Sequence, residues 1–349
     1  MKTSRERIGA IRPVDRNRYL RAKKRWDNLA KPIGGLGKVE EEIARIYAIK
    51  GDAHLENFAL LVFCADNGVV AEGVSQTGQD VTKNVADRFA TGETVSCLMA
   101  RRAGVKVYPL DVGVCGETRI PKAKTLLGTQ NMVKAAAMGE EDFEAAFEAG
   151  YTLAKKAKAC GGEVLLLGEM GIGNTTAATA AGCGLLHRDP LDLTGRGAGL
   201  SDAGLQKKIS AIRRALALHA PGRDALDLIR KVGSLDMAAM CGAITYGALN
   251  GMPVILDGAI TLVAAFAMVK THSDVRDYLV PAHATTEKVS QEILSCLGFA
   301  PVIEGNLHLG EGTGALCLVP ILQMGAEVFN EMISFKAAEI PAYKKKDEV

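Results

Sequence analysis

The chain has 349 residues, long enough for one large or two medium-sized domains. Its 48% apolar and 23% charged residues are ordinary values for a globular protein, and its net charge of +2 gives no reason to expect a nucleic acid or a membrane surface as a partner. The longest apolar run, residues 258–269, is too short to cross a bilayer, and the basic N-terminal segment lacks the apolar stretch of a signal peptide.

Short β-rich runs alternate with longer helical segments along the chain. The runs are almost continuous in Val, Leu, Ile and Phe, which is typical of strands buried on both faces of a parallel sheet. The helical segments start at capping residues and end near Gly or Pro. In chain order we expect helices at 16–29 and 38–50, a strand at 58–66, a helical segment at 80–104, strands at 105–114 and 163–170, a helix at 201–220, a strand at 252–258, a helix at 284–298, a weaker strand at 301–306 and a helix at 320–338.

This alternation predicts an α/β domain, with helices packed on a mostly parallel sheet, over residues 56–319. Residues 1–55 and 320–349 show helical patterns only. We therefore expect the two ends of the chain to pack together as a smaller helical domain.

The eight cysteines and six histidines form no recognisable site. No CxxC pair exists and several cysteines lie in apolar runs, so we expect reduced thiols in a cytoplasmic protein. The spacings HxH, HxxxH and HExxH are absent, and structural or surface roles are favoured even for His272 and His283, the only two near each other. No metal site is predicted.

A glycine-rich turn follows the third expected strand, in the stretch LLLGEMGIGNTTAATAA. Ligands of parallel sheets bind beyond the carboxyl ends of the strands, and the N-terminus of a helix favours an anion there. The turn lacks the GxGxxG dinucleotide pattern, and no GxxxxGK[ST] loop is present, so a phosphate group is favoured over a dinucleotide or a nucleoside triphosphate. For any such turn taken alone, a purely structural role is the alternative. The candidate phosphate ligands are Gly171, Gly173, Asn174, Thr175 and Thr176.

A second glycine-rich loop, residues 194–199, leads into the helix expected at 201–220. This loop would close on the same phosphate, with Lys207 or Lys208 as its positive charge. The alternative for both lysines is a solvated helix face.

Two glutamates lie among glycines, Glu169 in GEMG and Glu311 in LGEGTGA. A glutamate held in this way in an apolar stretch is partly desolvated, which raises the pKa of its carboxyl group towards that of a useful general base. Both are therefore candidates for catalysis. Asp66, after the first strand, has a structural alternative as the cap of its turn.

Five motifs in this order resemble the nicotinate-nucleotide:dimethylbenzimidazole phosphoribosyltransferase family. The resemblance spans nearly the whole chain, and five ordered motifs are far more specific than one glycine-rich turn. The motifs are KPIGGLGKVE (31–40), ADNGVVAEGVS (65–75), GEMGIGNTTAA (168–178), GRGAGLSDAGLQKK (195–208) and LGEGTGA (309–315).

The resemblance implies a three-layer α/β fold with a mostly parallel, Rossmann-like sheet, a small helical domain from both chain ends, and a homodimer. It implies transfer of ribose 5-phosphate from nicotinate mononucleotide to 5,6-dimethylbenzimidazole or a related base, without a metal or an organic cofactor. The product, α-ribazole 5′-phosphate, becomes the lower ligand arm of cobalamin.

The same resemblance implies roles for single residues. Glu311 matches the general base that removes a proton from the attacking ring, and Glu169 matches a residue near the ribose or the nicotinate. Ser75 would lie beside the benzimidazole. The implied ligands of the 5′-phosphate are Asn174, Thr175, Thr176, Gly197 and Lys208.

Three alternatives stay open at this point. The acceptor is a benzimidazole, a purine or a phenol, and with a phenol Glu311 would deprotonate a hydroxyl group. A non-catalytic binder of nicotinate nucleotide or α-ribazole would keep the same loops. A redox enzyme on a Rossmann-type sheet is disfavoured by the missing fingerprint.

Overall fold

The computed structural model describes residues 2–197, 199–220, 222 and 224–343. At its centre is a sheet in which every pair of neighbouring strands is parallel, in the order β2-β1-β3-β4-β5. All residues of β1 are buried, as its continuous apolar sequence predicts. The expectation of an α/β fold on a parallel sheet is therefore confirmed. The strands are β1 (Phe58–Ala65), β2 (Lys106–Gly113), β3 (Val164–Met170), β4 (Val254–Leu256) and β5 (Leu279–Pro281).

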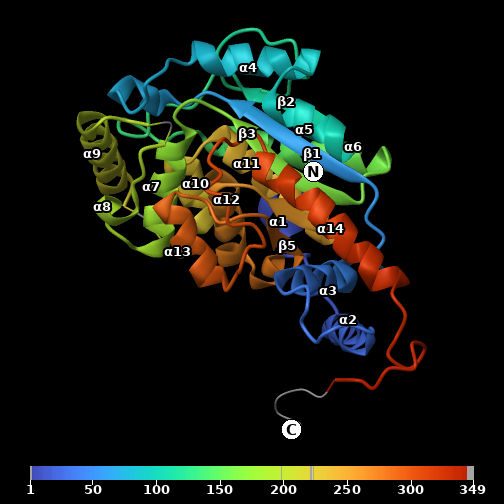
Figure 1. Ribbon diagram of the computed structural model, residues 1–349. Helices are drawn as coiled ribbons and strands as arrows, with labels where there is room; N and C mark the ends of the chain where they lie inside the picture. Colours follow the sequence, from blue (N-terminus) through green and yellow to red (C-terminus); the bar gives the residue numbers. More distant parts are fainter. Residues whose placement is uncertain (1, 198, 221, 223, 344–349) are drawn as a thin grey trace.

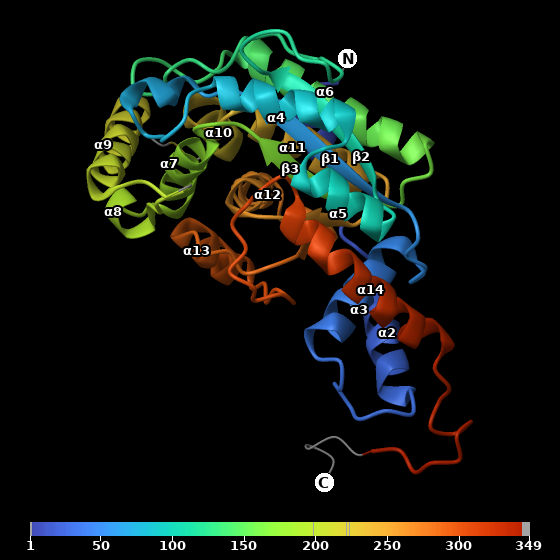
Figure 2. The same ribbon diagram turned by 45° about the horizontal axis from the view of Figure 1, so that its top comes forward.

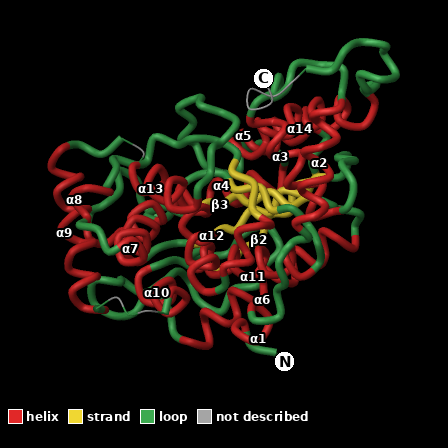
Figure 3. Tube along the Cα trace, turned by 90° about the horizontal axis from the view of Figure 1, so that it is seen from below, coloured by secondary structure: helices red, strands yellow, loops and turns green. Residues whose placement is uncertain are grey.

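Helices lie on both faces of the sheet (Figures 1 and 3). Side chains of β1 alternate between two hydrophobic cores: Leu61 and Phe63 enter one, while Leu60 and Val62 enter the other. The first core includes residues of α6 (Glu140–Ala159), α7 (Asn174–Leu186), α9 (Asp202–His219), α10 (Ala225–Val232), α11 (Leu235–Leu249), α12 (Ala259–Thr271) and α13 (Lys288–Leu297). The second includes residues of α2 (Arg16–Asn28), α3 (Lys38–Lys50), α4 (Asp80–Thr91), α5 (Val95–Ala103) and α14 (Thr313–Glu331).

The remaining helices of the described residues are short. They are α1 (Ser4–Ile8), η1 (Gly68–Glu72), α8 (Pro190–Leu193) and η2 (Ser273–Tyr278). Among the described residues, no helix is both long and apolar enough to cross a membrane. The apolar run at 258–269 forms most of α12, which, like α11, is buried on nearly all sides.

The two ends of the chain meet, because α2 and α3 project from the sheet beside the last turns of α14 (Figure 2). The ring of Phe329 lies 5.0 Å from that of Trp26 and 5.6 Å from that of Tyr47, measured between centroids. However, α14 begins at Thr313 and runs through the boundary expected at residue 320, and its core continues into the sheet. The division into two domains stays a prediction, and residues 1 and 344–349 of it lie outside the described residues.

Two sequence-based expectations are wrong. The fifth strand is β5, whereas the segment 301–306 forms only an isolated bridge, between Ile303 and His283. Pro281 cuts the apolar run of β5 short, so no strand pattern stands out there in the sequence. The segment 80–104 forms two helices, because Gly92 ends α4 with φ 72° and Thr94 caps α5. This break brings the N-terminus of α5 to the candidate site.

Candidate active site

A cavity of about 360 Å³ lies at the carboxyl ends of the strands, among the loops that follow β1, β3, β4 and β5 and those that precede α9 and α14. Parallel sheets place ligands at this edge because the loops after neighbouring strands converge there. Nine of the ten residues predicted from the sequence line this cavity. They are Ser75, Glu169, Gly171, Gly173, Asn174, Thr175, Gly197, Lys208 and Glu311.

Thr176 is the residue that departs from the expectation. Its side chain is fully buried, does not line the cavity, and its hydroxyl oxygen has no hydrogen-bond partner among the described residues. Its backbone N–H donates to the carbonyl oxygen of Gly173 at 3.0 Å, so it is not free for a phosphate either. Thr176 follows Thr175 on α7, and its side chain points into the protein because successive residues of a helix face different directions.

The turn between β3 and α7 needs its glycines. A Cβ atom on Gly171 would lie 2.2 Å from the carbonyl oxygen of Ala65, and Gly173 precedes α7 with φ 93°. α7 is buried along almost its whole length, so its N-terminus is held firmly at the edge of the cavity. Among the described residues, the backbone N–H of Thr175 has no recorded partner, which leaves it available to an anion.

The positive end of the cavity is formed by Lys208, which lies on α9 and is fully buried. Its Nζ donates to Oγ1 of Thr175 at 3.1 Å. Burial lowers the pKa of Lys208, and the charge of Glu287 opposes this shift. A Cβ atom on Gly197 would lie 3.1 Å from Oγ1 of Thr175, so the second glycine-rich loop packs on the same spot. Residue 198 of that loop lies outside the described residues.

The carboxyl group of Glu169 is buried at the end of β3. Burial, followed by the charge of Asp236, raises its pKa to about 8. The side-chain amide of Asn174 donates both to Glu169 Oε2 and, at 3.1 Å, to Asp236 Oδ2. Asn174 therefore bridges two buried carboxyl groups and is not the free phosphate donor that the sequence suggested. The sequence analysis missed Asp236, whose signal is a lone acid in the otherwise apolar helix α11.

Glu311 lies in a tight turn before α14. Gly310, Glu311 and Gly312 all have positive φ, of 89°, 58° and 80°, and the conformation of Glu311 is unfavourable for a residue with a side chain. Glu311 Oε2 accepts hydrogen bonds from the backbone N and the Oγ of Ser96, at 3.3 and 2.8 Å. Glu311 Oε1 has no recorded hydrogen-bond partner among the described residues. One oxygen is therefore oriented by the N-terminus of α5 and the other remains available.

Asp257, after β4, holds this turn in place. Its Oδ2 accepts from the backbone N of Gly312 at 3.2 Å, and its Oδ1 accepts from those of Gly314 and Ala315 at 2.7 and 3.1 Å. The carboxylate thus caps α14 directly after Glu311. In the sequence Asp257 stands out only as part of a turn, since nothing local indicates a partner more than fifty residues away.

His283 is another lining residue that the sequence analysis set aside. Its Nε2 lies 3.7 Å from Asp257 Oδ1, and its buried Nδ1 has no hydrogen-bond partner among the described residues. Asp66, in contrast, does not line the cavity, and its Oδ2 accepts from the backbone N of Cys115 at 2.8 Å, which favours the structural alternative. No group of three His, Cys, Asp or Glu residues suited to a metal ion exists in the described part of the chain.

The cavity lining therefore combines two kinds of chemical group. Thr175, Gly197 and Lys208 offer hydrogen-bond donors and a positive charge for an anion such as a phosphate. Glu169 and Glu311 offer carboxyl groups for proton transfer. On a parallel α/β fold, such a lining suits an enzyme that binds an anionic substrate and transfers a proton beside it.

Comparisons with known proteins identify the family. A family model described as phosphoribosyltransferase matches residues 11–340. A nicotinate-nucleotide–dimethylbenzimidazole phosphoribosyltransferase of Alkaliphilus metalliredigens is 37% identical, with 97% of this chain and 99% of the relative covered. The crystal structure of CobT from Thermus thermophilus superposes with a TM-score of 0.90 at 37% identity, covering 94% of this chain and 100% of the other. The chain belongs to the nicotinate-nucleotide–dimethylbenzimidazole phosphoribosyltransferase family.

Proposed function

We propose that this chain transfers the phosphoribosyl group of nicotinate mononucleotide to 5,6-dimethylbenzimidazole or a related base, giving α-ribazole 5′-phosphate and nicotinate for the cobalamin nucleotide loop. Relatives named for this enzyme align with nearly the whole chain. The observation that carries the proposal is that one cavity combines the Lys208–Thr175 pair, whose donors and charge suit an anion, with the carboxylate of the Glu311 turn.

The proposed reaction forms one C–N bond and breaks another. A ring nitrogen of the base attacks C1′ of the ribose, and the electron pair of the old glycosidic bond leaves with the pyridine nitrogen of nicotinate. The configuration at C1′ inverts from β to α. The other ring nitrogen loses its proton to Glu311, because the product ring would otherwise be a cation. General base assistance of this kind is typically worth about 10²–10⁴-fold in rate.

Fixed geometry makes Glu311 suited to this role. Ser96 orients one carboxylate oxygen, and Asp257 holds the backbone directly after Glu311. Gly168 allows β3 to contact the same turn, since a Cβ atom there would lie 2.7 Å from the carbonyl carbon of Glu311. A base that needs no reorganisation on binding the substrate contributes more to the rate than a mobile one.

Glu169 has a different proposed role. With its pKa raised to about 8, it is mainly protonated at neutral pH, so it can donate a hydrogen bond instead of adding a second negative charge. Its Oε1 would lie 2.5 Å from a Cβ atom on Gly310, so it lies against the turn that carries Glu311. We propose that protonated Glu169 binds the ribose or the departing nicotinate, while Ser75 contacts the acceptor ring.

A turnover assay separates an enzyme from a non-catalytic binder. The protein is incubated with nicotinate mononucleotide and dimethylbenzimidazole, and released nicotinate and α-ribazole 5′-phosphate are measured by mass spectrometry. We expect equal amounts of both products. Nucleotide binding without turnover would support the binder and contradict the proposed enzyme. A panel of acceptors with benzimidazole, purine and phenol members determines which base is preferred.

Glu311→Gln tests the base directly. Glutamine keeps an oxygen that can accept from Ser96 but cannot take up the proton, so we expect nucleotide binding to persist while turnover falls by about 10²–10⁴-fold. The matched control is Glu327→Gln, which removes the same charge from an exposed position on α14. Turnover at the wild-type rate in Glu311→Gln would remove this residue from the mechanism.

The homodimer and the cytoplasmic location also belong to the proposal. Val95 and Leu98 on α5 and Met324 on α14 expose large apolar side chains, and α5 packs against α14, which supports a subunit interface there. All eight cysteines are free thiols, which supports a reducing compartment. Light scattering of the purified protein and fractionation of the producing cells test these two statements.

A further inference from the structure

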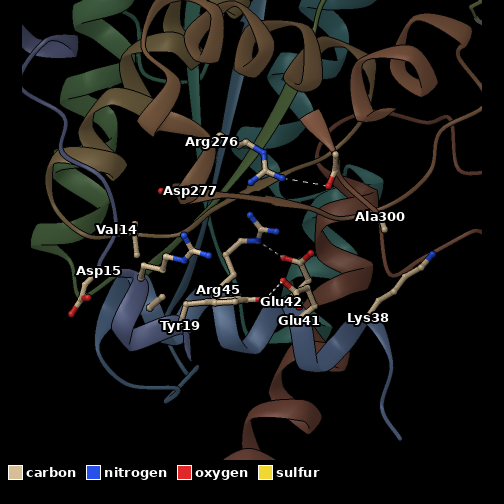
Figure 4. A pocket seen from close by; sticks show the side chains of 13 residues that line it. Val14, Asp15, Tyr19, Lys38, Glu41, Glu42, Arg45, Arg276, Asp277 and Ala300 are labelled. Atoms are coloured by element: carbon tan, nitrogen blue, oxygen red, sulfur yellow. Dashed lines mark hydrogen bonds and ion pairs between the residues drawn. The ribbon is translucent and has the colours of Figure 1, made fainter. Parts of the chain in front are cut away.

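A second cavity, of about 530 Å³, lies on another part of the molecule and shares no lining residue with the candidate active site. It lies between α2 and α3 on one side and η2 with the end of α13 on the other (Figure 4). Its volume is in the range of cavities that hold small molecules. Nothing in the proposed reaction uses it.

Two arginines dominate its wall. Arg45 of α3 and Arg276 of η2 point towards each other across the cavity (Figure 4). Both guanidinium groups stack on the ring of Phe299, with Cζ atoms 5.2 and 5.1 Å from the ring centroid. Two like charges are therefore held close together by one aromatic side chain. Burial, and then repulsion by Arg45, lower the pKa of Arg276.

The guanidinium groups form only some of the hydrogen bonds that they can donate. Nε of Arg45 donates to Oε2 of Glu42 at 3.2 Å, and its terminal nitrogens have no recorded hydrogen-bond partner among the described residues. Arg276 donates to the carbonyl oxygens of Leu297 and Gly298, at 2.7 and 3.4 Å. Arg16, a third lining arginine, is exposed and has no recorded ion pair or hydrogen bond within the described part of the chain.

Carboxylates around the cavity offset part of this charge, and those of Glu41, Glu42 and Asp277 act on Arg276. Glu42 is almost fully buried, which raises its pKa to about 7, so at neutral pH it is only partly ionised. Glu41 accepts from the hydroxyl group of Tyr19 at 2.6 Å and from Lys23 at 3.2 Å. The other charged groups on the wall are Asp15, which caps α2, Asp277, and Lys38, which pairs with Glu304.

We propose that this cavity binds a small molecule through a multivalent oxyanion group, a phosphate ester or a polycarboxylate, held between Arg16, Arg45 and Arg276. Planar guanidinium groups donate pairs of parallel N–H bonds to such oxygens. Stacking on Phe299 fixes two of the three groups in advance, which reduces the entropy lost on binding. The bound anion also removes the repulsion between Arg45 and Arg276.

Calorimetric titration with inorganic phosphate and with citrate tests the proposal. The Lys208→Ala protein is used beside the wild type, because this change weakens the separate anion site of the active-site cavity. We expect saturable binding of at least one probe to both proteins. Tighter binding of phosphate indicates a phosphate ester and tighter binding of citrate indicates a polycarboxylate. No saturable binding of either probe to Lys208→Ala overturns the proposal.

Variants locate the site. Arg45→Gln should weaken binding by about tenfold or more, as expected for loss of a charge-assisted hydrogen bond, whereas Glu42→Gln should tighten it by removing the competing carboxylate. Arg16→Gln, at an exposed position, gives the same test if Arg45→Gln does not fold. Lys24→Gln removes an exposed charge of α2 that does not line the cavity, and it is the matched control. Unchanged affinity in Arg45→Gln and Arg16→Gln, or an equal loss in Lys24→Gln, overturns the proposal.

Discussion

Replacing Asp257 by Asn removes the carboxylate that joins β4 to the turn of Glu311. Three backbone N–H groups, those of Gly312, Gly314 and Ala315, donate to its two oxygens in the structure. The side chain is buried, with only 3% of its surface exposed, so water cannot replace a lost bond. Asn has nearly the same shape, which makes the change a test of charge and hydrogen bonding and not of packing.

The magnitude follows from these three bonds. The amide oxygen of Asn can keep the bonds from Gly314 and Ala315, but its NH₂ group then faces the N–H of Gly312, donor against donor. An unpaired buried donor costs about 1–3 kcal/mol, and loss of a negative charge at the start of a helix costs about 0.3–2 kcal/mol. Added together, these terms predict that the free energy of unfolding falls by about 1–5 kcal/mol.

Catalysis should fall as well, because the left-handed conformation of Glu311 is unfavourable on its own and relaxes when its support is weakened. A displacement of about 1 Å at a reacting group can cost about 10²-fold in rate, so we expect kcat to drop by about 10–100-fold. Urea unfolding gives the stability, and steady-state kinetics with both substrates give kcat and KM. The KM for nicotinate mononucleotide should change less, because Lys208 and Thr175 are untouched.

The matched control is Asp224→Asn. Asp224 also accepts two backbone N–H bonds as the cap of a helix, α10, but it is partly exposed and does not line the active-site cavity. Asn and Asp cap exposed helices about equally well, so this variant should lose less than about 0.5 kcal/mol and keep its activity. Equal stability losses in the two variants, or wild-type kcat in Asp257→Asn, would refute the reasoning.

Three further predictions follow from single contacts. The pKa of Glu169 is about 8 in the folded state and 4.5 ordinarily, so between these pH values the folded state keeps a proton that the unfolded state loses, and stability falls as pH rises. Glu169→Gln should flatten this pH dependence of the free energy of unfolding, measured with urea. An unchanged slope contradicts the raised pKa. Lys208→Ala should raise KM for nicotinate mononucleotide by about 10-fold or more, with a smaller effect on kcat, and unchanged KM would exclude Lys208 from phosphate binding. Gly150→Ala should destabilise the protein by about 2–3 kcal/mol, because the new Cβ would lie 1.7 Å from the carbonyl oxygen of Ala239. This clash outweighs the higher helix propensity of Ala. A higher melting temperature of the variant would contradict this prediction.

Local patterns in the sequence were sufficient for much of the fold. Four strands were recognised because each lies in a continuous apolar run bounded by turn residues, and β5 was missed because Pro281 cuts its apolar run short. The helices α11 and α12 were not recognised as core elements, since a helix that is buried on all sides shows no apolar stripe. The break at Gly92 was missed because the apolar spacing continues across it.

The sequence by itself determined which residue types stand at the ends of the strands: the glycines of the β3 turn, the lysine of α9 and the glutamates among glycines. These signals are local, since a positive φ or a helix cap depends on a few neighbouring residues. Tertiary structure alone decided which of these groups meet, as in Ser96 on Glu311 and Asp236 beside Glu169. Such pairs join residues far apart in the chain, and their distances depend on how helices pack on the sheet, which no local pattern records.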